Sequence, residues 1–201
     1  MHTAQYQRAE EWRSDWLADP QVFAYKLPRL IQEKGDLDWL SAEVGARLLS
    51  AEKRVVTAES CTAGGIGAAL TAIAGSSRWV EGGFITYSNA AKMKLLGVPQ
   101  EQIETQGAVS QEVVESMAQG ALRSLGAECS VAVSGVAGPG GGTPHKPVGT
   151  VWFSWAGVTG PHALHSQVLV FPGDRAAIRA ATIVIALLGL LAVKPNPSIN
   201  V

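Results

Sequence analysis

Short apolar runs alternate with segments of helical periodicity along the middle of this chain, and this alternation constrains the fold most strongly. Apolar side chains recur at helical spacing from Leu37 to Leu49, and the β-branched run of residues 55–57 follows them. Residues 84–87 and 129–133 are two further short strand-like runs, and the helical pattern between them begins after Ser110, a residue type that caps helices. Strands that are separated by helices pair in parallel and bury both faces of their sheet. This part of the sequence therefore predicts an α/β fold.

The last third of the chain follows a different pattern. Residues 149–158 and 162–171 form two apolar runs joined by a short connection of Thr, Gly and Pro, which is typical of neighbouring antiparallel strands. A final helix is expected to begin near Asp174 and to continue through Val193. Together with the earlier alternation, this pattern predicts a three-layer α/β/α sandwich with a mixed, mostly parallel sheet.

The first 35 residues are expected to form an arm rather than a domain. Aromatic side chains stand among charges in residues 1–35, and Pro20 and Pro28 are expected to interrupt any long helix. So short a segment buries too little surface to form its own core, and we expect its aromatic side chains to pack on the domain or on a second subunit. Residues 36–201 then form one domain. The aromatic arm and the apolar helix that follows Ser110 also predict a homo-oligomer.

Charge and composition exclude several classes of function. The formal net charge of −1 leaves no basic excess to attract nucleic acid or an anionic membrane surface. Residues 182–193 are strongly apolar, but a bilayer span needs about 20 such residues, so we expect a buried helix there. The two cysteines are too few for a disulfide framework and favour a reducing, cytoplasmic environment. Neither they nor the four histidines match a metal-binding spacing, so we expect no metal and no cofactor.

Ser60 is the first candidate for catalysis. It lies just past an expected buried strand, before a glycine-bearing turn and a helix, which is a position that exposes a nucleophile. Glu59 is placed to orient this turn. Ser60 fits a simple helix cap equally well, and spacing alone leaves both interpretations open. Cys61 is a rival nucleophile, although a small buried thiol is the more common role for such a residue.

Lys92 is the second candidate. It lies three residues after Asn89, the expected cap of a short helix, and can point back toward the strand end that carries Ser60. Desolvation lowers the pKa of a lysine, and the neutral amine then accepts a proton from a serine. A solvated lysine such as Lys94 is the simpler alternative. Tyr87 is expected either to donate a hydrogen bond in the site or to pack on the strand.

Two further features are suited to binding an anion. The loop that follows Ser134 contains Gly138, Gly140 and Gly141, whose backbone can approach a ligand closely, although a merely flexible loop fits as well. Arg175 and Arg179 lie four residues apart at the start of the last helix, share one face, and are placed to grip a phosphate. Surface ion pairs are the alternative for both arginines.

Several short blocks of this chain, taken in order, resemble the CinA C-terminal domain family, the bacterial nicotinamide-mononucleotide deamidases. The blocks are Ala58-Glu59-Ser60-Cys61-Thr62, Ile73-Ala74-Gly75-Ser76-Ser77, Thr86-Tyr87-Ser88-Asn89-Ala90-Ala91-Lys92, Leu96-Gly97-Val98, Gly107-Ala108-Val109-Ser110, Ser134-Gly135-Val136-Ala137-Gly138-Pro139-Gly140-Gly141 and Lys146-Pro147-Val148-Gly149-Thr150-Val151. The resemblance covers residues 36–193. So many ordered blocks are far more specific than any one of them.

The resemblance implies hydrolysis of the carboxamide of nicotinamide mononucleotide to the acid and ammonia. It implies Ser60 as nucleophile and Lys92 as base with Tyr87 beside them, and it places Ser76 and Ser77 in the same pocket, with Ser77 as an alternative nucleophile. Backbone N–H groups near Thr62 and Gly64 are expected to stabilise the oxyanion. The glycine loop and the region of Arg175 are expected to hold ribose and phosphate.

The chain departs from the family pattern in two ways. Ala63 stands where the family usually has the first glycine of Glu-Ser-Cys-Thr-Gly-Gly, and a positive φ there would strain the turn. The family often carries an upstream domain, whereas only the arm precedes the hydrolase part here. A nucleotide-binding module without catalysis is therefore an alternative, and a purely structural subunit is a third that leaves the glycine loop unexplained.

Overall fold

The computed structural model describes residues 2–34, 38–160 and 163–194, and these ranges fold around one five-stranded sheet. Across the sheet the strand order is β2-β1-β3-β4-β5. The strands are β1 (Val55–Glu59), β2 (Val80–Ile85), β3 (Cys129–Gly135), β4 (Thr150–Ala156) and β5 (Leu164–Val170). Strand β1 pairs in parallel with β2 and β3, whereas β3 with β4 and β4 with β5 are antiparallel pairs. The α/β class and the mixed sheet are confirmed, but the pairing is only partly parallel.

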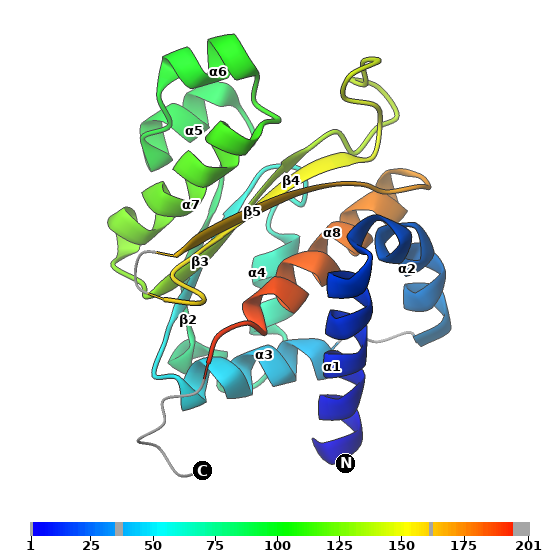
Figure 1. Cartoon of the computed structure of the whole chain (residues 1–201). Coiled ribbons are helices and arrows are strands. Elements are labelled where there is room, and N and C mark those ends of the chain that lie inside the picture. Colours follow the sequence, from blue (N-terminus) through cyan, green and yellow to red (C-terminus); the bar gives the residue numbers. More distant parts are fainter. Residues whose placement is uncertain (1, 35–37, 161–162, 195–201) are drawn as a thin grey trace.

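Helices cover both faces of the sheet, so the predicted three layers are present (Figure 1). The helices are α1 (His2–Ala18), α2 (Pro20–Lys34), α3 (Asp38–Ser50), α4 (Gly65–Thr71), α5 (Asn89–Leu96), α6 (Gln100–Gln106), α7 (Gln111–Leu125) and α8 (Arg175–Leu190), and a 3₁₀ turn spans Ser76–Arg78. Helix α7 packs on one face, with α5 and α6 against it, and α8 and α4 pack on the other, with α3 against them. None of the helices in the described ranges is both long and apolar enough to cross a bilayer.

Strand alternation divides the interior into two cores. On β1, Val55 belongs to the core under α8, and Val56 and Ala58 belong to the smaller core under α7. Val131 and Val133 of β3 repeat this arrangement on the α8 side. The apolar run of residues 182–193 lies largely in the first core, as the sequence predicted.

Some local predictions differ from the structure. The second strand begins at Val80 rather than Phe84, because Gly82 and Gly83 hide its pattern from propensity rules. Helix α5 is capped by Ser88, whose Oγ accepts from the N–H of Ala91, and not by Asn89. Neither α6 nor the 3₁₀ turn at Ser76–Arg78 was predicted. The cap of α7 at Ser110 is confirmed.

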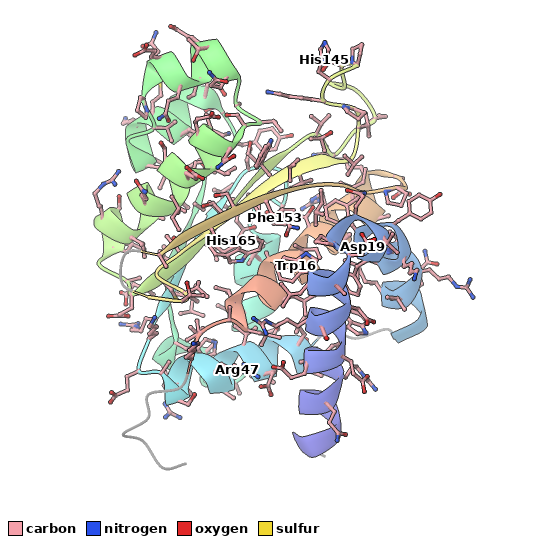
Figure 2. The ribbon with its side chains drawn as sticks, viewed as in Figure 1. Trp16, Asp19, Arg47, His145, Phe153 and His165 are labelled. Atoms are coloured by element: carbon pink, nitrogen blue, oxygen red, sulfur yellow. The ribbon has the colours of Figure 1, made fainter. Side chains whose placement is uncertain are left out.

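The N-terminal arm consists of two helices. Asp19 separates them, because its Oδ1 accepts from the N–H of Val22, and Pro20 takes the first position of α2, where no N–H is required (Figure 2). The expectation that Pro28 interrupts a helix is wrong, since Pro28 lies inside α2. The buried side chains of this helix, among them Phe23 and Leu27, pack into the main core and offset the cost of the proline.

Trp12, Trp16 and Phe23 of the arm pack on the domain of the same chain, one of the two outcomes expected, whereas Tyr25 is exposed. Trp12 lies edge-on to Trp39 of α3 at 5.3 Å between ring centroids. Trp16 lies 5.7 Å from Trp155 of β4. Trp155 in turn lies so close to Gly189 of α8 that a side chain at position 189 would clash with its ring. The division of the chain at residue 36 stays a prediction, because residues 35–37 lie outside the described part.

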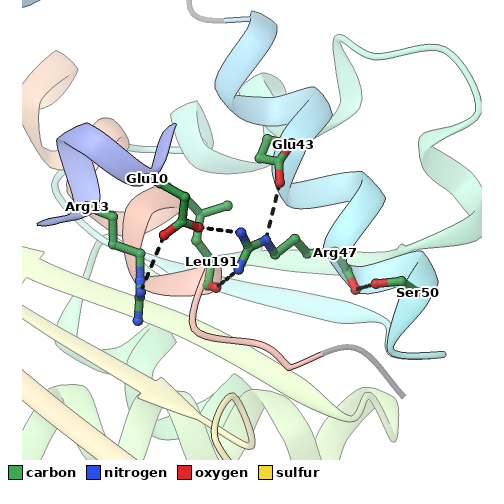
Figure 3. Close-up of polar contacts among 6 residues, drawn as sticks. All are labelled: Glu10, Arg13, Glu43, Arg47, Ser50 and Leu191. Atoms are coloured by element: carbon green, nitrogen blue, oxygen red, sulfur yellow. Dashed lines mark hydrogen bonds and ion pairs between the residues drawn. The ribbon is translucent and has the colours of Figure 1, made fainter. Parts of the chain in front are cut away.

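Polar contacts also hold the arm in place. Figure 3 shows the guanidinium of Arg47 on α3 between the carboxylates of Glu10 and Glu43, with its Nη1 donating to the carbonyl oxygen of Leu191 at 2.8 Å. The side-chain amide of Gln21 donates to the carbonyl of Val170 at 2.6 Å and accepts from the N–H of the same residue at 3.1 Å. Gln21 thereby occupies part of the free edge of β5.

Replacing Trp16 by alanine tests whether the arm belongs to the core. Trp16 is 3% exposed, so we expect Trp16→Ala to lower the free energy of unfolding by about 3–5 kcal/mol in urea denaturation. Tyr25 on the same arm is 70% exposed, and Tyr25→Ala should change that free energy by less than about 0.5 kcal/mol. Equal effects of the two substitutions would show that the arm is not part of the cooperative core.

Candidate active site

The three candidate segments meet at one edge of the sheet. Because β1, β2 and β3 are parallel, the turns that follow Glu59, Ile85 and Gly135 all leave the same edge, which is the usual location of sites in α/β proteins. Backbone hydrogen bonds between neighbouring strands continue into the turns that follow them. The N–H of Ser60 donates to the carbonyl of Val133 at 3.1 Å, and the N–H of Thr86 donates to that of Glu59 at 2.8 Å. These bonds fix where Ser60 and the start of the next turn lie.

The structure brings Ser60 and Lys92 together. The Nζ of Lys92 lies 3.0 Å from the Oγ of Ser60, and the two side chains come from the β1 turn and from helix α5. Lys92 is 1% exposed and Ser60 is 8% exposed. Lys92 is therefore not a solvated surface lysine, whereas Lys94 on the same helix is exposed.

The surroundings of Lys92 favour its uncharged form. Burial lowers the pKa of its amine below the ordinary value of 10.5. No carboxylate of the described residues pairs with it. Its other contacts are the carbonyl oxygens of Thr86 at 2.8 Å and Tyr87 at 3.4 Å. A neutral amine has two N–H donors for these two carbonyls, and its lone pair is then available to the Ser60 hydroxyl.

Glu59 orders the turn that carries Ser60. Its carboxylate is 1% exposed and accepts hydrogen bonds from the hydroxyls of Thr57 and Thr62 and from the N–H groups of Ile66 and Gly67. The sequence predicted an orienting role for Glu59, and these contacts show how it is exerted. The same bonds occupy the first N–H groups of α4, so they are not free to bind a ligand.

The turn adopts the conformation that the sequence pattern implied. Ala63 has φ of 50° and Gly64 has φ of 93°, so both residues are left-handed. An alanine in this region is strained, whereas a glycine is not. The N–H of Ala63 nevertheless donates to the carbonyl of Ser60 at 3.2 Å, which closes the turn. The alanine therefore adds strain to the turn but does not change its left-handed conformation.

Cys61 is a buried thiol. It is 5% exposed, and burial raises the pKa of its thiol to about 12, so it is protonated at neutral pH. Only a thiolate is an effective nucleophile. The simpler of the two interpretations of Cys61 therefore fits its environment better.

A cavity of about 200 Å³ opens beside Ser60 and Lys92. It is lined by Ser60, Cys61, Tyr87, Asn89, Lys92, Ala108, Val109, Ser134, Gly135, Ala137 and Arg175. Asn89, Ala108 and Val109 were not predicted as site residues. Ala108 and Val109 come directly before the α7 cap Ser110, so only the folded chain reveals that they approach the sheet edge. Ser134 is buried and donates to the carbonyl of Ala108 at 2.7 Å, which ties two walls of the cavity together.

The two arginines of α8 have different surroundings. Arg175 is exposed at the cavity, donating to the carbonyl of Gly138 at 3.0 Å and to the hydroxyl of Tyr87 at 3.3 Å. Arg179 is half-buried and donates from Nη2 to the carbonyl of Thr62 at 2.7 Å. Thr62 itself is fully buried, and neither it nor Gly64 lines the cavity.

Of the predicted substrate-binding residues, Ser134 and Arg175 line this cavity, whereas the others do not: Thr62, Gly64, Ser76, Ser77, Gly138, Gly140, Gly141 and Arg179. Ser76 and Ser77 precede β2, and because β2 is parallel to β1 they lie at the opposite edge of the sheet from Ser60. The carbonyl of Ser77 accepts from Arg54, which precedes β1 at that edge. The expectation that these serines line the pocket is therefore wrong. Gly140 and Gly141 lie exposed farther out in the loop between β3 and β4.

The described residues contain no cluster of three or more His, Cys, Asp or Glu side chains suited to a metal ion. The polar groups at the cavity are instead a serine hydroxyl, an amine, a phenol and a guanidinium. A hydroxyl and an amine at hydrogen-bond distance in a buried site have the geometry of a nucleophile and its base. This arrangement is suited to acyl transfer.

Comparison with known proteins defines the class to which this fold and site belong. Residues 37–193 match the model of the CinA C-terminal domain, and the chain belongs to that family. It is 51% identical over 152 residues to the nicotinamide-nucleotide amidohydrolase PncC of Pseudomonas putida, covering 76% of this chain and 93% of the relative. The amidohydrolase of the same name from Escherichia coli K12 is 48% identical over 144 residues, which are 72% of this chain and 86% of that protein.

Solved structures support the same assignment. The competence/damage inducible protein CihA of Agrobacterium tumefaciens superposes with a TM-score of 0.73 at 43% identity, covering 76% of this chain and 92% of that one. A CinA superfamily protein of Klebsiella pneumoniae gives a TM-score of 0.74 at 36% identity, covering 78% and 96%. The N-terminal arm precedes the residues that match the family.

Replacing Ala63 by glycine tests the strain in the Ser60 turn. A left-handed alanine costs about 1–2 kcal/mol, part of which the greater flexibility of unfolded glycine cancels, so Ala63→Gly should raise the free energy of unfolding by roughly 0.5–1 kcal/mol. Ala68→Gly, at an exposed position of α4, is the matched control and should lower it by about 1 kcal/mol. A loss of stability in Ala63→Gly as large as in the control would show that position 63 is not strained.

Proposed function

We propose that this chain hydrolyses the carboxamide of nicotinamide mononucleotide, giving nicotinic acid mononucleotide and ammonia. The observation that carries the proposal is the contact of 3.0 Å between the buried amine of Lys92 and the hydroxyl of Ser60 at the wall of a cavity. The amidohydrolase relatives, which are about half identical over most of the chain, support the substrate class.

The first half of the reaction forms an acyl-enzyme. Neutral Lys92 takes the proton of Ser60 while Oγ attacks the carboxamide carbon. We assign stabilisation of the resulting oxyanion to the backbone N–H groups of Thr62 and Gly64, since the N–H of Ala63 donates to Ser60 and those of Ile66 and Gly67 donate to Glu59. The carbon–nitrogen bond then breaks, and Lys92 returns its proton to the leaving nitrogen, which departs as ammonia.

The second half releases the acid. Water attacks the acyl carbon, Lys92 takes a proton from that water, and the ester bond to Ser60 breaks as Oγ regains a proton. Amide and water are thereby converted into acid and ammonia, and the enzyme returns to its starting state. The amine of Lys92 takes part in every proton transfer of this scheme. Its burial matters because burial favours the uncharged form with which each half of the reaction begins.

We assign the pyridine ring to the cavity and the phosphate to its mouth. The cavity of about 200 Å³ lies next to the hydroxyl of Ser60, and Arg175 is the exposed cation at its wall. A guanidinium binds phosphate oxygens in pairs. Tyr87 lies between the two regions, since its backbone carbonyl contacts Lys92 and its hydroxyl contacts Arg175. The exposed Gly140 and Gly141 are the further backbone donors that we assign to the phosphate.

We also propose that the protein acts in the cytoplasm as a homo-oligomer. Both cysteines are free and buried, which suits a reducing compartment. The side chains of Trp12, Trp16 and Phe23 and the apolar face of α7, on which the expectation of an oligomer rested, are buried within the chain itself. The support is instead the exposed apolar side chains Ile85 and Leu95. Size-exclusion chromatography with light scattering measures the assembly.

Substitutions of Ser60 and Lys92 test the mechanism. Ser60→Ala removes the nucleophile and Lys92→Met removes the base at similar volume, so each should reduce the rate of ammonia release from nicotinamide mononucleotide by about 10³-fold or more. Circular dichroism should show an unchanged fold. Ser77→Ala and Lys94→Met are the matched controls, because both residues are exposed, and they should keep normal turnover.

Three outcomes would contradict the proposal. Normal turnover in Ser60→Ala or Lys92→Met would exclude that residue from catalysis. Loss of turnover in Ser77→Ala would make Ser77 the nucleophile. Tight binding of the nucleotide by the wild-type protein in calorimetry, with no ammonia released in the same sample, would identify a binding module instead.

A further inference from the structure

We propose that Arg179 is a positioning residue that holds the Ser60 turn in its reactive conformation, and that it is not a ligand of the substrate phosphate. This proposal rests on the function proposed above. It assigns different roles to two arginines that lie one helical turn apart on α8 and that the sequence expected to act together on a phosphate.

The Ser60 turn is held from two sides. From one side, the carboxylate of Glu59 accepts from the hydroxyl of Thr62 at 2.7 Å. From the other side, the guanidinium of Arg179 donates to the carbonyl of the same Thr62 at 2.7 Å. Thr62 is fully buried and lies two residues after Ser60. The N–H of Gly65 also donates to this carbonyl, at 3.2 Å, so Arg179 is the partner that reaches the Thr62 carbonyl from outside the turn.

The turn needs such support because its backbone is strained. Ala63 follows Thr62 directly and is held at φ of 50° without being a glycine. Helix α4, which begins after the turn, has only seven residues and adds little rigidity of its own. Without the Arg179 contact, we expect the turn to relax and the N–H groups that we assign to the oxyanion to lose their alignment.

Helix α8 is well placed to act as the support. Gly65, the first residue of α4, lies so close to Ile183 of α8 that a side chain there would clash at 2.7 Å. Arg179 lies one turn before Ile183, so its guanidinium reaches the turn from a helix that is already packed against it. Arg175, one turn earlier still, is exposed and lines the cavity, whereas Arg179 does not line it.

This geometry predicts an effect on turnover rather than on binding. Arg179→Met keeps the packing of the stem but removes the donor to Thr62, and misplacing a reactive group by about 1 Å costs up to about 100-fold in rate. We therefore expect kcat to fall by about 10- to 100-fold for both nicotinamide mononucleotide and its riboside, with KM for the nucleotide unchanged within about twofold. Arg179→Lys retains a donor and should recover part of the loss.

A second measurement is independent of catalysis. Hydrogen exchange followed by mass spectrometry reports the stability of the peptide that contains residues 60–65. In Arg179→Met this peptide should exchange faster than in the wild-type protein, while peptides from β3 and α7 should be unchanged. In Arg179→Lys its exchange should lie between the two.

Arg47 offers a matched control. Its guanidinium also donates to a backbone carbonyl, that of Leu191, but at the far end of α8 from the site. Arg47→Met should lower the melting temperature yet leave kcat, KM and the exchange of residues 60–65 unchanged. Arg175→Met provides the contrast, because it should raise KM for the nucleotide and not for the riboside.

Each contrary result has a definite meaning. A rise in KM for the nucleotide alone in Arg179→Met would make Arg179 a phosphate ligand and overturn the proposal. Unchanged kcat and unchanged exchange in that variant, or an equal loss of kcat in Arg47→Met, would also overturn it. If the wild-type protein releases no ammonia, the proposed function fails, and the exchange data alone then decide whether Arg179 holds the turn.

Discussion

The contact between the amine of Lys92 and the hydroxyl of Ser60 is the interaction on which the account of this protein depends. Ser60 directly follows β1 and Lys92 lies on the helix after the neighbouring β2, so their meeting at 3.0 Å requires the parallel pairing of β1 with β2. It also requires burial, because an amine in water would keep its proton and could not act as a base. The fold supplies both conditions with β1 between two parallel neighbours and helices on both faces of the sheet.

The polar groups around this pair have separable tasks. Glu59 and Arg179 touch the turn through Thr62 and act on its geometry, whereas Arg175 and Tyr87 face the cavity. The tryptophans of the N-terminal arm pack on α3 and β4, and its helix α2 packs against α8, the helix that carries Arg175 and Arg179. We therefore regard the arm as part of the structural core. The chemistry belongs to the residues that match the CinA C-terminal domain.

The sequence predicted the fold class, the helix cap at Ser110, the start of the last helix near Asp174, and the approach of Lys92 to Ser60, because periodicity, capping residues and strand ends are local signals. It misplaced Ser76 and Ser77, since residues at the two ends of a connection lie at opposite sheet edges once the strands are parallel. It missed the cavity wall at Ala108, because no local signal shows that the segment before α7 returns to the sheet edge near Ser60. The prediction that Pro28 breaks a helix was also wrong, because the packing of the other side chains of α2 outweighs the local cost of one proline.

The most direct test is a titration of Lys92 itself. The Cε signal of ¹³C-labelled lysine, assigned by its loss in Lys92→Met, reports the protonation state of the amine as pH is raised. The account predicts that Lys92 loses its proton at a pH below the ordinary lysine value of 10.5. A Lys92 that keeps its proton up to that ordinary value would contradict the claim that a buried, uncharged amine activates Ser60.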